Sequence, residues 1–257
     1  MLIQPIDIIK TSWKFYTTNW KKFIIYLLLL FIPTILLKSI GLLSSYYSSY
    51  AEDLYITSTV ITVIAFTASI LFSLWISIAL TKAIKRTYKN EPLENWKKMI
   101  SNNTYLIWPV ILTSIMTTAL VVIGSILFLI PGIIFFVWYS FTFYEVMFND
   151  KKSTKALASS KSLVVGRWWS ILWRMLVPGI TFGILMAIII SLILLPIKFF
   201  IPPTSTLFEF ISNIVGIIIN LALTPLLSVA TLILYFSARE NPIEQTLPST
   251  NELPTNL

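Results

Sequence analysis

Six apolar stretches, each about as long as the hydrocarbon core of a bilayer is thick, constrain this sequence more than any other feature. A helix needs about 20 mainly apolar residues to cross a membrane, and in lipid its backbone polar groups must be satisfied internally. The chain has a mean hydropathy of +0.83 and 12% charged residues, about half the charged share of a soluble domain. The sequence therefore predicts an all-α, polytopic membrane helical bundle with six transmembrane helices. The predicted spans cover about residues 23–43, 57–81, 104–123, 126–148, 168–195 and 209–236.

The boundary between the third and fourth spans lies within residues 104–148, where the only charged residue is Glu145. This stretch is too long for one span and long enough for two. We expect the turn at Gly124-Ser125, because it leaves two spans of adequate length, with Pro131-Gly132 kinking the second. A turn at Pro131-Gly132 is the alternative, and it leaves the fourth span short.

Amphipathic surface helices are expected beside the spans. Residues 4–22 place apolar side chains and lysines on separate helical stripes, which is typical of a helix lying in the membrane interface. Residues 19–36 and 95–112 share Asn-Trp-Lys-Lys and further positions in register, and a looser third copy starts at Arg167. We interpret each copy as a surface helix, a tryptophan anchor and a span. Thr206 with Glu209 predicts a capping box at the sixth span, and Gly166 is expected to end a helix in the second basic loop.

The lysines and arginines indicate the orientation in the membrane. Six spans place all but two of the 19, Lys38 and Lys198, on one side. Because cationic loops stay on the cytoplasmic side, we expect a multi-pass protein of a prokaryotic cell (plasma) membrane with both termini cytoplasmic. We expect the membrane domain to cover residues 1–238 and the first span to be retained rather than cleaved. Residues 239–257 are polar and predict a disordered cytoplasmic tail.

Several classes of function have no support in the composition. The chain has no cysteine and no histidine, which removes thiol-ligated metals and the commonest general base. Phosphate loops, metal-ligand clusters and nucleophile elbows are missing from the sequence. We therefore expect no enzymatic activity, no cofactor and no metal. Nucleic acid is not an expected partner, because membrane orientation already explains the positive charge.

Two sets of residues are candidates for binding. Basic and aromatic residues beside the spans are suited to anionic lipid headgroups, although they also anchor and orient helices. The candidate headgroup contacts are Trp20, Lys21, Lys22, Trp96, Lys97, Lys98, Arg167 and Trp168. Glu145 and Asn220 are candidates for an intramembrane polar site, because an ionisable or polar group in an apolar run often marks one. For Glu145 we favour a position at headgroup depth, solvated or paired with a loop lysine.

Small residues recur every fourth position in two spans. The second span has Ala65, Ser69, Ser73, Ser77 and Thr81, and the fifth has Gly179, Gly183, Ala187 and Ser191. Small residues let helices approach closely in lipid, so we interpret both ridges mainly as packing surfaces. A polar lining for a substrate path is the alternative.

A Pro-Gly within a span, an acid-containing loop and Ala-Leu-x-x-Ser-x-x-Leu-Val-x-Gly follow one another in residues 130–168. Ala156-Leu157, Ser160, Leu163-Val164 and Gly166 supply the last pattern. It resembles the membrane domain attached to some bacterial glycerophosphodiester phosphodiesterases and its stand-alone relatives of unassigned role. The resemblance implies a six-helix bundle with amphipathic cytoplasmic helices. It does not imply phosphodiesterase activity, because that catalytic domain is a separate barrel that uses histidine.

Our leading hypothesis is a non-enzymatic membrane protein that organises lipid, anionic lipid included, or a membrane partner. The alternative is a small transporter or a membrane subunit of a transport complex. The internal repeat and the prolines in the fourth, fifth and sixth spans support the alternative. The repeated units keep one orientation, however, and the spans hold no central charged relay.

Overall fold

The computed structural model describes residues 1–48 and 52–242. The loop residues 49–51 and most of the predicted tail, 243–257, lie outside the described residues. Every regular element of the described part is a helix, as expected, and six segments are long and apolar enough to cross a membrane. These segments are Pro5–Leu37, Thr59–Tyr88, Trp96–Leu127, Leu129–Asn149, Trp168–Phe200 and Thr206–Glu240. The prediction of an all-α bundle with six candidate spans is thus confirmed.

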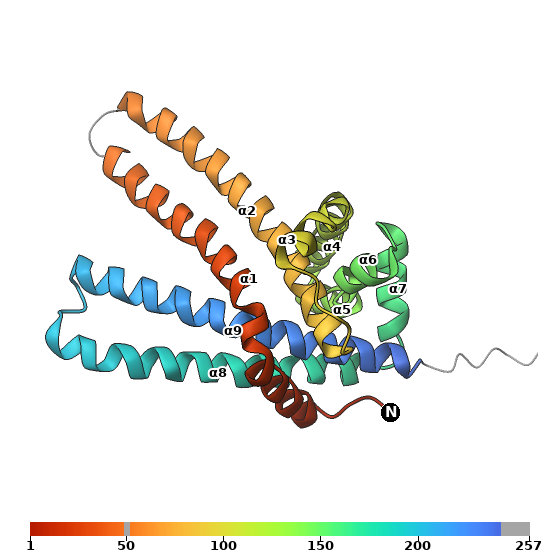
Figure 1. Ribbon diagram of the computed structural model, residues 1–257. Coiled ribbons are helices and arrows are strands. Elements are labelled where there is room, and N and C mark those ends of the chain that lie inside the picture. Colours follow the sequence, from red (N-terminus) through yellow and green to blue (C-terminus); the bar gives the residue numbers. More distant parts are fainter. Residues whose placement is uncertain (49–51, 243–257) are drawn as a thin grey trace, which may run out of the picture.

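Two long helical hairpins dominate the molecule. The first pairs α1 (Pro5–Ser48) with α2 (Glu52–Tyr88), and the second pairs α8 (Trp168–Phe200) with α9 (Thr206–Glu240). The hairpins meet at one end, which we call the base, and diverge from it (Figure 1). The shorter elements α3 (Trp96–Ser101), η1 (Thr104–Leu106), α4 (Ile107–Leu127), α5 (Leu129–Trp138), α6 (Thr142–Asn149) and α7 (Thr154–Val164) complete the molecule.

Helix α1 differs from the prediction of a separate surface helix followed by a span. It is one continuous helix of 44 residues, about 66 Å long and so about twice the hydrocarbon thickness. Its first turns pack into the base, where Ile8 is fully buried and Phe15 contacts the core. Trp13 and Trp20 remain about half exposed on the other side. The predicted helix therefore does have two different sides, but one of them packs against protein.

The turn between the third and fourth spans lies at Phe128, and not at either predicted position. Phe128 has an extended backbone between α4 and α5. Gly124 and Gly132 instead allow α4 and α5 to pack closely. A Cβ atom on Gly132 would lie 2.1 Å from Ser125 Oγ, and one on Gly124 would lie 2.7 Å from the Phe135 ring. Pro131 lies in the first turn of α5, where proline causes no kink.

The fourth candidate span is interrupted at residues 139–141, between α5 and α6. Ser160 of α7 satisfies backbone groups that the interruption frees: its Oγ donates to Trp138 O at 2.8 Å and accepts from Phe141 N–H at 3.1 Å. Ala156, Leu157 and Val164 are buried on the same face of α7. The Ala-Leu-x-x-Ser pattern thus stabilises a broken helix here.

Helix α9 is the centre of the bundle, and α8 lies at its edge. In the most apolar window of α9, 56% of the residues are buried, against 6% in α8. On α2, Ser69 and Thr81 of the small-residue ridge are buried, as a packing surface requires. On α8 the expected packing is not found, because the space around Gly179 and Gly183 is open.

Several helix ends follow from local chemistry. Gly166 follows α7 with φ 88°, as predicted for a helix end. The cap of α9 is Ser205, not Thr206, and its hydroxyl accepts from Phe208 N–H at 3.2 Å. Helix α9 continues through Arg239 to Glu240, into the segment expected to be a tail.

The chain's first residue and the C-terminal end of α9 meet at the base. The Met1 ammonium group donates to Asn241 Oδ1 at 2.7 Å, and Ile3 N–H donates to Ser237 Oγ at 2.9 Å. The C-terminal end of α2 lies at the same end of the molecule (Figure 1). The first residue and the C-terminal ends of α2 and α9 therefore lie at one end of the molecule.

Candidate functional site

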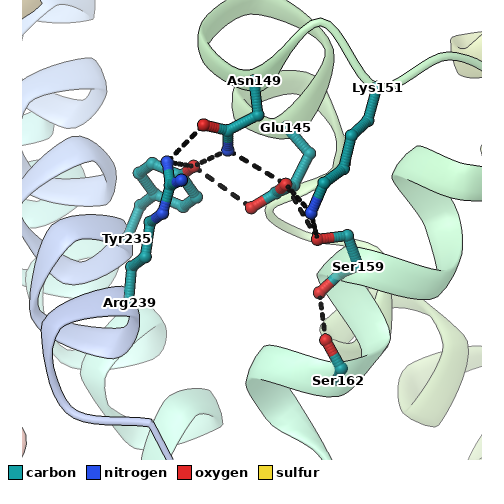
Figure 2. A network of polar contacts seen from close by, with 7 residues as sticks. All are labelled: Glu145, Asn149, Lys151, Ser159, Ser162, Tyr235 and Arg239. Carbon is teal, nitrogen blue, oxygen red and sulfur yellow. Dashed lines mark hydrogen bonds and ion pairs between the residues drawn. The ribbon is translucent and has the colours of Figure 1, made fainter.

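Glu145 on α6 is the centre of a polar network at the base, although its flanking residues are apolar. Its side chain is only 2% exposed. Ser159 of α7 donates to Oε2 at 2.8 Å, and Asn149 Nδ2 donates to the same oxygen at 3.0 Å. The hydroxyl of Tyr235 on α9 donates to Oε1 at 3.1 Å. Figure 2 shows these side chains converging on the carboxylate from three helices.

A tight turn after α6 brings a cation onto this carboxylate. Asp150 has a left-handed backbone with φ 51°, so the chain reverses and Lys151 N–H donates to the Glu145 carbonyl at 3.3 Å. The Lys151 ammonium then lies 3.2 Å from Glu145 Oε2 and donates to Ser159 Oγ at 2.6 Å. The interpretation that Glu145 pairs with a loop lysine agrees with this contact.

Arg239 extends the network along α9. Its guanidinium donates to Asn149 Oδ1 and, at 3.2 Å, to the Tyr235 hydroxyl. We call Glu145, Asn149, Lys151, Ser159, Tyr235 and Arg239 the Glu145 clamp. Both carboxylate oxygens accept hydrogen bonds and the charge is paired, as a buried ionic group requires. The clamp therefore holds α6, α7 and α9 together at the base.

Asn220, the other predicted polar residue, belongs to a different place. It precedes Tyr235 by 15 residues on α9, which is about 22 Å along a helix, so the structure does not bring it to Glu145. Asn220 lines a groove of about 440 Å³ between α1 and α9, which we call the Asn220 groove. Its polar lining is Thr34, Ser212, Asn213, Asn220 and Thr224.

The lining of the Asn220 groove is polar but uncharged. The hydroxyls of Thr34, Ser212 and Thr224 donate to carbonyls of their own helices, at 3.0, 2.9 and 2.7 Å. Each hydroxyl oxygen therefore keeps acceptor capacity. Asn220 Nδ2 donates to Gly216 O at 2.8 Å. The groove can therefore accept hydrogen bonds from neutral polar groups, and it offers no lining charge for an ion.

The predicted headgroup residues fall into three separate places. Lys21 and Lys22 are exposed beside Trp20 on α1, and Lys97 and Lys98 are exposed on α3 next to the half-buried Trp96. The third pair is Arg167 and Trp168, at the junction of α7 and α8. Trp168 packs against Trp169 with 4.7 Å between ring centroids.

Arg167 makes protein contacts instead of being free. Its guanidinium donates to Leu163 O at 2.8 Å and to the carbonyls of Ala238 and Asn241. Burial lowers the pKa of Arg167. The residue connects the α7–α8 junction to the end of α9.

Tyr235 and Arg239, which complete the clamp, were not predicted as site residues from the sequence, and neither were Lys85 and Lys89. The available signal was the spacing of Tyr235 and Arg239, four residues apart on one helical face. It gave no indication that this face meets α6, which is 90 residues away.

No protein-family model, no curated protein and no solved structure matches the chain. The resemblance of residues 130–168 to the membrane domain of some phosphodiesterases stays a prediction from the sequence. The role of the protein must therefore be argued from its geometry.

Proposed function

We propose that this multi-pass membrane protein is not an enzyme and that it organises lipid, or a membrane partner, between its two hairpins. The observation that carries the proposal is the Asn220 groove, which lies between α1 and α9 of the two diverging hairpins. The surface of α8 is mostly apolar and exposed. Such a surface is suited to lipid tails or to other membrane helices.

The contrast between the two polar places supports a binding role. The acid of the Glu145 clamp is occupied by protein donors, which leaves it no free site for a substrate. The Asn220 groove is open and keeps unused acceptors, so it can hold a polar group at membrane depth. The proposed location is the plasma membrane, with the base and both termini in the cytoplasm.

Co-purification tests this function. The full chain is extracted in a mild detergent, and retained lipids and proteins are identified by mass spectrometry. Gly216→Leu should fill the groove without a clash, because a Cβ atom there meets nothing within 4 Å, and we expect it to lose most of the retained molecule. Gly183→Leu on the outer face of α8 is the matched control and should retain it. Absence of both lipid and partner from the unmodified protein would overturn the proposal.

A transport role is the second candidate, and the observation that favours it is the position of Asn220 on an open groove in the middle of α9. Helices α8 and α9 continue unbroken through Pro178, Pro196 and Pro225, which weakens the expected likeness to broken transporter helices.

Because the chain contains no cysteine, Asn220→Cys introduces a single reactive thiol. Labelling of that thiol by a charged, membrane-impermeant reagent from both sides of the membrane would favour transport. Protection from both sides would favour a lipid-filled groove. Single cysteines at Ser48 and Lys97 report the two sides as controls, and equal labelling of both from one side would contradict the six-span topology.

A further inference from the structure

Two lysines lie over one pair of stacked aromatic rings at the base, and an arginine follows one of these rings on α9. Phe148 and Phe236 stack with 6.2 Å between ring centroids. The Lys85 ammonium lies 4.5 Å from the Phe148 ring, and the Lys89 ammonium lies 4.9 Å from the Phe236 ring. Arg239 follows Phe236 by three residues, on the same side of α9. We call Lys85, Lys89 and Arg239 the cation cluster.

Three other cations at the base have partners that account for them. Arg86 pairs with Glu94 at 2.7 Å, Lys151 pairs with Glu145, and Arg167 donates to three carbonyls. Within residues 1–48 and 52–242, no carboxylate lies within ion-pair distance of Lys85, Lys89 or Arg239. Arg239 donates only to the neutral Asn149 and Tyr235.

The charges in the cluster repel one another. Glu91 is the strongest charged neighbour of the Lys85 ammonium, and Lys89, Arg239 and Arg86 together act against it. An aromatic face attracts a cation by only about 0.5–1 kcal/mol at an exposed site, and it does not neutralise the charge. A bound anion would relieve this repulsion where the ends of α2 and α9 lie close together.

Phosphate is the anion that fits this arrangement and this depth. Arginine and lysine are the usual phosphate ligands in proteins, and several phosphate oxygens can be shared among three cations. The cluster lies where the apolar segments 59–88 and 206–240 end, which is headgroup level for helices that cross a bilayer. Lys89 and Arg239 are exposed, and Lys85 is half-buried, so a ligand can reach all three.

We propose that Lys85, Lys89 and Arg239 form a binding site for the headgroup phosphate of an anionic phospholipid, with Phe148 and Phe236 as its floor. This inference rests on the proposed lipid-organising role and names the lipid class. The site differs from the headgroup residues predicted from the sequence, which lie on α1, on α3 and at the start of α8.

The experiment measures lipid binding to the full chain by native mass spectrometry. Phosphatidic acid is the probe, phosphatidylcholine is the neutral comparison, and inorganic phosphate is tested as a competitor. The unmodified protein should prefer phosphatidic acid about tenfold or more, since each cation near an anionic headgroup adds a sizeable attraction. Lys85→Gln/Lys89→Gln should abolish this preference, while Lys152→Gln/Lys155→Gln, which removes the same charge from exposed lysines at the start of α7, should keep it.

A second variant separates binding from folding. Lys85→Arg/Lys89→Arg keeps the charge and should keep the preference, even if the glutamine pair proves less stable. Equal loss of preference in the two glutamine pairs would overturn the site in favour of general charge attraction. Competition by millimolar inorganic phosphate would overturn the lipid as its ligand. If lipid is retained without headgroup preference, the site is wrong and the proposed function stands; if neither lipid nor partner is retained, both are wrong.

Discussion

Polar and small residues have opposite surroundings in two parts of this protein. One part is the base, and the other is the arms, the portions of the two long hairpins that extend away from the base. At the base Glu145 is buried and its oxygens are occupied by donors from three helices, and between the shorter helices α4 and α5 Gly132 allows close contact. Along the arms Asn220 faces an open groove, and Gly183 faces open space. The difference indicates that the base specifies the fold, whereas the arms present surfaces to the membrane. Matched substitutions in the two regions test whether this difference is real.

The largest effect is expected from Glu145→Ala. Removing the carboxylate leaves Lys151, Ser159 and Tyr235 without their common acceptor, and breaking a buried ion pair on one side costs about 3–5 kcal/mol. Because Lys151 is 43% exposed, we expect a loss of about 3 kcal/mol of unfolding free energy, measured by denaturant titration in micelles. Glu94→Gln, at the exposed pair with Arg86, should cost at most about 1 kcal/mol. Equal losses would show that the clamp is no stronger than a surface pair.

Gly132→Ala should have the next largest effect. The new methyl group would lie 2.1 Å from Ser125 Oγ, so α4 and α5 must separate, at a cost of about 1–3 kcal/mol. Gly183→Ala on α8 is the control, and its unfolding free energy should equal or slightly exceed that of the unmodified protein. A destabilised Gly183→Ala would mean that the α8 surface is packed in the membrane.

Ser160→Ala should cost about 1–2 kcal/mol, because Phe141 N–H and Trp138 C=O would lose their shared partner beside the interruption in the fourth span. The same titration measures the change. Ser191→Ala, on the exposed ridge of α8, removes a hydroxyl without such a role and should change the free energy by less than about 0.5 kcal/mol. If the two substitutions change the unfolding free energy equally, water or lipid satisfies the backbone groups at the interruption.

The smallest effect on stability is expected from Asn220→Leu. The side chain is exposed to the groove and bonds only within its own helix, so the unfolding free energy should change by less than about 0.5 kcal/mol. Retention of a bound polar lipid or partner should nevertheless fall. A loss of more than about 1 kcal/mol would place Asn220 in a packed interface like that of the base.

The sequence predicted the helices well, because hydrophobic length and charge placement act locally. It predicted their ends and partners less well. Phe128 forms the turn although it carries no turn signal, and the two glycines nearby are used for helix contact. Ser205 rather than Thr206 caps α9, since both are suitable residues and only the backbone decides between them. Continuity of α1 could not be predicted from its amphipathic pattern, since the same stripe can face lipid or protein.

The site was predicted in part for a similar reason. Glu145 was recognisable as a lone acid, and a lysine partner six residues away was within local reach. Tyr235 and Arg239 contribute from the far end of the chain, and helix periodicity carries no information about which helix a polar face will meet. The cation cluster likewise exists only because the ends of α2 and α9 meet.

The length of α1 has a mechanical consequence. Tyr16 donates to the Ala222 carbonyl in the middle of α9, and α1 runs unbroken from there to Ser48, about 48 Å further on. If this contact is a pivot, a rotation of only 5° there would displace the far tip by about 4 Å. A small rearrangement where the two hairpins cross would thus be magnified at the far tip of α1, which lies away from the base (Figure 1).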